Sequence, residues 1–140
     1  MTPQSTDHFT GLLRNTIVAL VRRDGPDLTA RQLGVFLTCY LETEAQTVRG
    51  LALALGVSKP PITRALDRLG EYDLARRKTD PLDRRSVLVQ RTATGMAFLR
   101  MLREILRESV PEAEPMAEIA AITPAPAKRP AKRESRRAAA

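Results

Sequence analysis

Residues 47–70 contain two short helical patterns separated by a glycine, and this arrangement limits the possible folds most strongly. Apolar residues recur on one helical face in VRGLALAL and again in PITRALDRL. Between them, Gly56 is placed to end the first helix in the left-handed conformation. Two short helices joined by a tight glycine turn are typical of a helix-turn-helix. The two expected buried stripes are Val48, Leu51, Ala52 and Leu55, and Ile62, Ala65, Leu66 and Leu69.

Two adjacent prolines, Pro60 and Pro61, stand at the start of the second of these helices. The first N–H groups of a helix have no intrahelical acceptor, so proline loses no hydrogen bond there, and its fixed φ favours a helix start. If Ser58 is the N-cap residue, the two N–H groups that its hydroxyl would normally bind do not exist. Either the helix begins a residue or two later, or the Ser58 hydroxyl is left without a capping bond.

Further helical patterns flank this pair. One covers residues 6–23, and a second follows Thr29, which has a capping-box spacing with Gln32. A third begins after Thr92 and ends near Val110 and Pro111. The first helix has one apolar stripe, the second an expected buried face, and the last a pattern close to a heptad seam. These sets are Phe9, Leu12, Leu13, Ile17, Leu20 and Val21 in the first helix, Leu33, Phe36, Leu37, Tyr40 and Leu41 in the second, and Phe98, Leu99, Leu102, Ile105 and Leu106 in the last.

The segment LARRKTDPLDRRSVLVQR interrupts the helical pattern. Its ends are β-prone, especially at Val87 to Val89, and its centre holds Asp80 and Asp83, which we interpret as turn residues rather than metal ligands. We therefore expect a basic hairpin with about four residues in each strand. The whole pattern predicts a mainly α fold with one small β-hairpin, a winged helix-turn-helix with flanking N- and C-terminal helices.

The charge of the chain favours an anionic partner. The formal net charge is +7, and clustered Lys and Arg residues attract anions and displace counterions from nucleic acid. Residues 111–140 are an Ala-, Pro-, Lys- and Arg-rich tail that we expect to be disordered apart from a helical turn or two around Met116 to Ile122. Its last part, residues 123–140, has six Lys and Arg residues against one Glu and so carries a charge of +5. Residues 1–110 then form the folded domain.

The residues that usually carry catalysis or metal binding are few. His8 is the one histidine, and we expect it at the surface, while Cys39 is expected to pack in the core. We therefore expect no enzymatic activity, no metal and no cofactor. A single cysteine cannot form an intramolecular disulfide, and the first apolar run is broken by Arg14 and Asn15, so it resembles neither a signal peptide nor a membrane span. These features favour a cytoplasmic protein.

Three strings resemble the MarR family of bacterial transcription regulators: LTARQ at residues 28–32, VSKPPITRALDRL at 57–69, and DPLDRRSVLV at 80–89 followed by TATG. The resemblance implies a homodimer that binds double-stranded DNA and is then associated with the bacterial nucleoid. It also implies that a small effector lowers the affinity of the protein for DNA. The chain has Asp73 where such proteins usually have Gly, and Asp tolerates the left-handed conformation. It has Arg91 where an apolar residue usually closes the second wing strand, which removes a core contact or adds a surface charge. A proline-interrupted segment replaces the further helix that the resemblance implies for the dimer.

The second helix of the pair, about residues 59–70, would enter the major groove, where Thr63 and Arg64 read bases. On an ordinary solvated face, Arg64 and Arg68 would instead flank Asp67 and bind it weakly. The wing, about residues 78–86, suits the minor groove, and the resemblance implies that Asp83 orients one wing arginine. Thr47 either meets a phosphate or simply caps its helix. The predicted DNA-binding residues are Thr47, Ser58, Lys59, Pro60, Thr63, Arg64, Arg68, Lys78, Asp83, Arg84 and Arg85.

We expect the first and last helices to form the dimer interface, which would place two recognition helices about one DNA turn apart. The predicted dimerisation residues are Phe9, Leu13, Ile17, Leu99, Leu102 and Leu106. An alternative function is that of a winged-helix adaptor whose basic face binds an acidic protein partner. The sequence does not specify the operator, the direction of regulation, the effector or the pathway.

Overall fold

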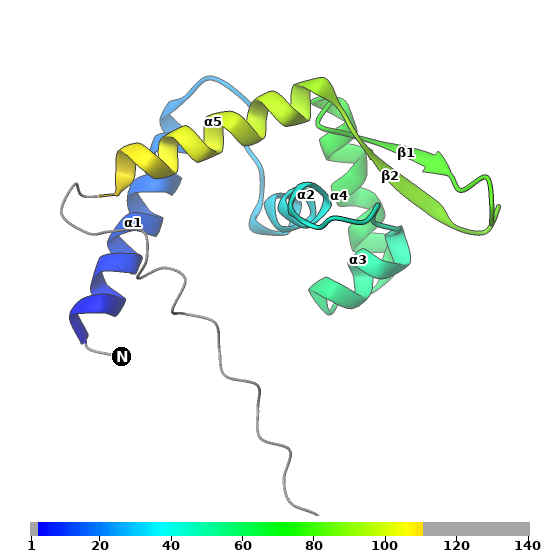
Figure 1. Ribbon diagram of the computed structural model, residues 1–140, viewed down its shortest axis with the longest axis horizontal. Coiled ribbons are helices and arrows are strands. Elements are labelled where there is room, and N and C mark those ends of the chain that lie inside the picture. Colours follow the sequence, from blue (N-terminus) through cyan, green and yellow to red (C-terminus); the bar gives the residue numbers. More distant parts are fainter. Residues whose placement is uncertain (1–2, 111–140) are drawn as a thin grey trace, which may run out of the picture. The chain divides into compact units, whose positions relative to one another are not determined.

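The computed structural model describes residues 3–110 as five helices and one antiparallel hairpin (Figure 1). The expectations for residues 111–140, including the helical turn around Met116 to Ile122, lie outside the described residues. The mainly α fold with a small hairpin is confirmed, and no helix in the described part is long and apolar enough to cross a bilayer. The elements are α1 (Pro3–Arg22), α2 (Ala30–Leu41), α3 (Val48–Leu55), α4 (Lys59–Glu71), β1 (Ala75–Thr79), β2 (Val87–Arg91) and α5 (Ala93–Ser109).

Side-chain caps begin three of the helices where the sequence predicted them. Thr29 and Gln32 form the complete capping box of α2. The hydroxyl oxygens of Thr47 and Thr92 accept hydrogen bonds from the backbone N–H groups of the third residues of α3 and α5, each at 2.9 Å. Gly56 ends α3 with a φ of 65°, the left-handed conformation expected there.

The start of α4 decides between the two alternatives that the double proline left open. Ser58 is the N-cap residue, with extended backbone angles, and Lys59 is the first helical residue. The Ser58 side chain makes no capping hydrogen bond. The prolines therefore do not delay the helix, and the serine hydroxyl is left without its usual backbone donors.

The core lies between α2, α3, α4, the hairpin and α5. Phe36 stacks on Tyr40 with ring centroids 4.3 Å apart, and it meets Phe98 edge-on at 5.1 Å. Most of the expected faces are buried, and Val35, which the pattern missed, is fully buried because neighbours surround α2 on more than one side. The prediction was wrong for Leu41, which is exposed at the end of α2. On the stripes of α1 and α5, Leu13, Ile17, Val21 and Leu106 are also exposed.

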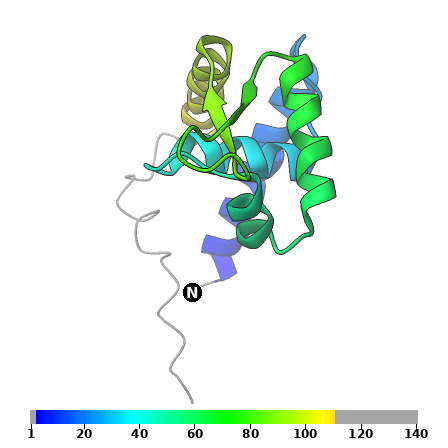
Figure 2. The same cartoon turned by 90° about the vertical axis from the view of Figure 1, so that its right-hand side faces the viewer.

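The hairpin is attached to the start of α3. Its register pairs Ala75 with Arg91 and Thr79 with Val87, so each strand has five residues. The N–H of Val89 donates to the Gln46 carbonyl at 2.9 Å. The whole hairpin at residues 75–91 is called the wing from here on. The hydrogen bond to Gln46 holds it against the segment before α3. Figure 2 shows it beside α4, with α3 near their lower ends.

Arg91 has a role that neither sequence alternative included. Its guanidinium donates to the carbonyls of Cys39 at 2.9 Å and Glu42 at 2.5 Å, which lie at the C-terminal end of α2. These carbonyls carry the negative end of the helix dipole, and α2 has no basic residue of its own in its last turn. Arg91 of β2 thus caps the C-terminal end of α2.

The hydroxyl of Tyr40 joins three segments at the base of the wing. It donates to the Leu74 carbonyl at 2.6 Å and accepts from the Thr92 N–H at 2.9 Å. The helix α5 passes so close that a Cβ on Gly95 would collide with this hydroxyl and with the Leu74 carbonyl. Glycine is therefore required at that position.

Asp73 turns the chain into β1 with a φ of 55°, so aspartate does occupy the left-handed conformation as expected. Its carbonyl accepts a hydrogen bond from the Thr92 hydroxyl at 2.5 Å. The hydrogen bond from Arg76, assisted by one from Thr94, lowers the pKa of the Asp73 carboxyl. The turn is thus held by both its backbone and its side chain.

We predict that Tyr40→Phe lowers the free energy of unfolding by about 1–3 kcal/mol, because it leaves a buried carbonyl and a buried N–H without a partner. Urea denaturation measures this loss. Tyr72→Phe is the matched control, since its hydroxyl is bound by Arg68 in a more exposed place, and it should cost less than about 0.5 kcal/mol. Equal losses in the two variants would contradict the role assigned to Tyr40.

Candidate nucleic-acid interface

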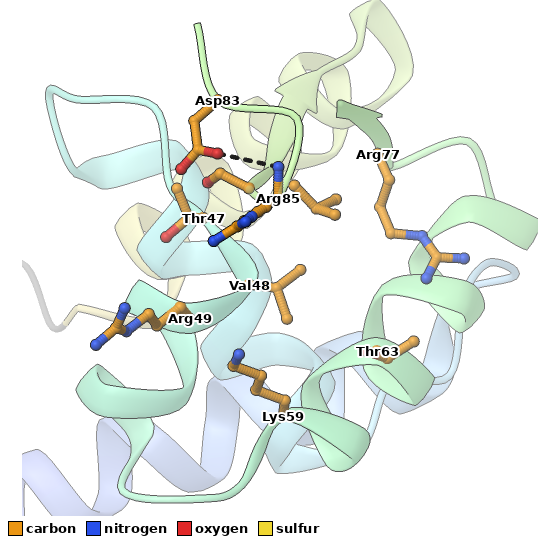
Figure 3. Close-up of a pocket in the computed structure, with 10 residues that line it drawn as sticks. Thr47, Val48, Arg49, Lys59, Thr63, Arg77, Asp83 and Arg85 are labelled. Carbon is orange, nitrogen blue, oxygen red and sulfur yellow. Dashed lines mark hydrogen bonds between the residues drawn. The ribbon is translucent and has the colours of Figure 1, made fainter. Parts of the chain in front are cut away.

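A basic cleft lies between the N-terminal ends of α3 and α4 and the wing (Figure 3). We call it the wing cleft. Its cations come from three different elements and the wing loop, although they are distant in sequence. Its polar lining consists of Arg49, Lys59, Arg77 and Arg85, the single acid Asp83, and the hydroxyls of Thr47, Thr63 and Ser86.

The structure brings five of the predicted DNA-binding residues to this cleft, namely Thr47, Lys59, Thr63, Asp83 and Arg85. The other six lie outside its lining, exposed at the start of α4, along α4 or on the wing. These are Ser58, Pro60, Arg64, Arg68, Lys78 and Arg84.

The tip of the wing is held by hydrogen bonds from two aspartates. Asp80 accepts from the Leu82 N–H at 2.9 Å through its carboxylate, and its own N–H donates to the Ser86 carbonyl at 3.0 Å. The Asp83 carboxylate accepts from the Arg85 N–H at 3.0 Å, the bond drawn in Figure 3. Asp83 thus fixes the backbone that carries Arg85, and both aspartates act as the turn residues that the sequence predicted.

The charged residues of α4 pair differently from the simple expectation for a solvated helix face. Arg68 binds Glu71 at 2.6 Å and the Tyr72 hydroxyl at 2.8 Å, and the hydrogen bond with Glu71 raises its pKa. Asp67 pairs with Arg77 of β1, so the alternative in which Arg64 and Arg68 would bind Asp67 on a solvated face is not what the structure shows. A partner on a neighbouring strand has displaced the local one.

Sequence reasoning missed Arg49 and Arg77 in the cleft. Arg49 lies two residues after the Thr47 cap, in the first turn of α3, and the N-terminal end of α3 borders the cleft. Arg77 alternates with Arg76 along β1, and strand alternation places it on the same side as the buried Ala75. That alternation was the available signal, but the run ARRK was interpreted only as basic.

Cys39 is buried in the core, as expected. Burial raises the pKa of its thiol to about 11, and the smaller opposing effect comes from the positive charge of Arg91. A raised pKa disfavours the nucleophilic thiolate. Among the described residues, no three or more His, Cys, Asp or Glu side chains gather as they would around a metal ion.

We predict that Cys39 in the native protein reacts very slowly with a thiol reagent at pH 8. With a pKa near 11, about one thiol in a thousand is ionised, roughly 100-fold fewer than for an exposed cysteine. Alkylation followed by mass spectrometry measures the rate, and the same protein in guanidinium chloride is the control. A native rate equal to the denatured rate would show that Cys39 is accessible and reactive.

The described elements define a winged helix-turn-helix protein with a basic cleft between helix and wing. Residues 28–87 match the model of the MarR family. A search of curated proteins found no match.

Solved structures of transcription regulators share the fold. One from Thermotoga maritima is 26% identical over 57% of this chain and 56% of its own, with a TM-score of 0.53. MarR is 27% identical over 59% of each chain, with a TM-score of 0.52. In both cases this chain spans less than two thirds of the matched protein. A mutant MarR from E. coli is 24% identical over 86% of this chain and 90% of its own, with a TM-score of 0.59.

Proposed function

We propose that this protein is a transcription regulator that binds double-stranded DNA in a sequence-specific way. The observation that carries the proposal is the wing cleft, which Lys59 and Thr63 of α4 line together with Arg85 of the wing. All the lining residues of this cleft lie within the segment that matches the MarR model, and the related fold of AbfR was solved bound to DNA. None of the matches above favours the alternative of a protein adaptor.

The first half of α4 would enter the major groove. Thr63 is half-buried at the cleft, and Arg64 is exposed one position further round the helix. An arginine there can bind guanine through two hydrogen bonds, and a threonine can bind a base or contact a thymine methyl. These two residues would supply sequence preference.

The other cations would position the protein on the backbone and in the minor groove. Lys59 lies at the positive end of the α4 dipole, next to Ser58, whose hydroxyl makes no capping hydrogen bond. Both side chains can therefore bind one phosphate. Arg85 and Arg84 are exposed at the wing tip, where the minor-groove potential attracts arginine. Such contacts make affinity fall as the salt concentration rises.

We further propose that the protein acts as a homodimer in the bacterial cytoplasm. Exposed apolar side chains lie on α1 and α5, which pack against each other, namely Leu13, Ile17, Val18, Val21 and Leu106. Of the other predicted interface residues, Phe9 is half-buried, whereas Leu99 and Leu102 are buried in the core of their own chain. The interface proposed here therefore rests on the exposed residues.

A small effector would need a pocket in the described part of the chain. A largely apolar cavity lies between α1, α2 and α5, lined in part by Leu20, Leu33 and Phe98. Its volume is about 70 Å³, well below the roughly 300–1,000 Å³ of common ligand pockets. An effector that binds there would have to move α1 or α5.

We predict that Arg64→Ala weakens binding to a selected DNA site by about 1–3 kcal/mol and relaxes preference at one base position. Fluorescence anisotropy on the selected site and on random DNA measures both effects. Arg103→Ala removes the same charge from an exposed place on α5 and is the matched control. Equal losses on the two DNAs would mean that Arg64 contacts only phosphate.

A gel shift on random genomic fragments tests the proposed function as a whole. The full chain should retard DNA at low salt and should release it as salt is raised. An absence of binding at low salt would contradict the proposal.

A further inference from the structure

An ion pair joins the recognition helix to the wing. The carboxylate of Asp67 on α4 accepts a hydrogen bond from the guanidinium of Arg77 on β1. The two side chains are 49% and 42% exposed, so the pair lies at the surface and not within the core. Neither residue is among those predicted from the sequence to bind DNA.

The position of Asp67 follows from helical spacing. Lys59, Thr63 and Asp67 are four residues apart and therefore lie along one face of α4. The first two line the wing cleft, so this face is turned toward the wing. In Figure 3 the Arg77 side chain extends from the strand toward α4 on the side of Thr63. Asp67 meets it one helical turn further on.

The position of Arg77 is fixed from the other side of the hairpin. Its register partner on β2 is Val89, which is buried and whose N–H binds the Gln46 carbonyl at 2.9 Å. Arg77 thus projects from the best anchored part of the wing. Through Asp67, the same part of the wing is also tied to α4.

The charge of Asp67 needs compensation at this place. An unpaired carboxylate on the cleft face of α4 would repel the phosphates that Lys59 and Arg85 are placed to attract. Pairing with Arg77 neutralises it. Exposed ion pairs contribute little to folding stability, so the main consequence of this pair is the orientation of the two elements.

We propose that Asp67 and Arg77 are positioning residues, which hold the wing at a fixed orientation to the recognition helix and so couple minor-groove contact to base reading. The inference rests on the proposed function. Sequence preference then depends on the pair although neither residue contacts a base. Breaking the pair lets wing and helix bind DNA independently, which costs preference more than affinity.

The chain offers a matched control on the same strand. Arg76 pairs with Asp73 at 2.9 Å, and its side chain is 66% exposed. This pair is local to the turn before β1 and does not reach α4. Arg76→Gln therefore removes one strand arginine and one ion pair but leaves the Asp67–Arg77 pair in place.

The experiment is a double-mutant cycle with Asp67→Asn, Arg77→Gln and the combined variant of the full chain. Each is titrated against a selected site and against random DNA at several salt concentrations. Sequence preference is the dissociation constant for random DNA divided by that for the selected site. This ratio should fall about fivefold in all three variants, because either change alone breaks the pair. Arg76→Gln should leave the ratio within about twofold.

Three results would overturn the proposal. Additive losses would make the residues independent contacts, and an unchanged ratio would leave the pair without a role. An equal loss on both DNAs, with a lower salt slope, would make Arg77 a phosphate ligand. If the wild type binds no DNA, the proposed function itself has failed.

A measurement on the free protein separates failure of the Asp67–Arg77 link from failure of the proposed DNA binding. Hydrogen exchange of the wing amides in the free protein should be faster in Asp67→Asn than in the wild type, and unchanged in Arg76→Gln. Unchanged exchange in Asp67→Asn would contradict the link between wing and helix whether or not DNA is bound.

Discussion

The arrangement of α2, the wing and α5 depends on the contacts of the Tyr40 hydroxyl. This hydroxyl binds the Leu74 carbonyl just before the wing and the Thr92 N–H just after it, so both ends of the hairpin are fixed to α2. Buried polar groups of this kind are costly to leave unpaired, which makes the geometry specific. Gly95 allows α5, the helix that bears part of the proposed dimer surface, to lie against the same hydroxyl and the Leu74 carbonyl.

Charged side chains then refine what the core positions. Arg91 ties the end of the wing to the end of α2, and Arg77 ties its first strand to α4. Asp83 fixes the backbone at Arg85. In each case a charge that looks like simple surface charge in the sequence makes a specific bond between or within elements. The other cations of the wing cleft, Arg49, Lys59 and Arg85, are exposed.

Local chemistry made much of the fold predictable. The caps at Thr29 and Thr92 and the left-handed Gly56 act within a few residues of their own position and were correctly placed. For Thr47 and for the proline start of α4, the sequence left two alternatives, and the structure shows a cap at Thr47 and a helix that begins at Lys59. Helical stripes were less reliable, because a stripe shows that a face is apolar but not what covers it. Much of the apolar face of α1 accordingly remains exposed in a single chain.

Contacts between distant residues escaped prediction. The Asp67–Arg77 pair joins residues ten positions apart, and the Arg91 bonds reach back about fifty positions. A pattern of residues does not reveal which of several nearby arginines an aspartate will choose, since the choice depends on how strand and helix pack. Half of the cleft cations, Arg49 and Arg77, were missed for this reason.

The central claim is that recognition helix and wing form one rigid head that reads both grooves of DNA. Chemical footprinting on a site selected from random DNA tests it directly, with dimethyl sulfate probing guanine N7 in the major groove and hydroxyl radicals probing minor-groove sugars. The account predicts two major-groove protections about one helical turn apart, each with an adjacent minor-groove protection. Major-groove protection without any protected minor groove, or a footprint with no discrete boundaries, would contradict it.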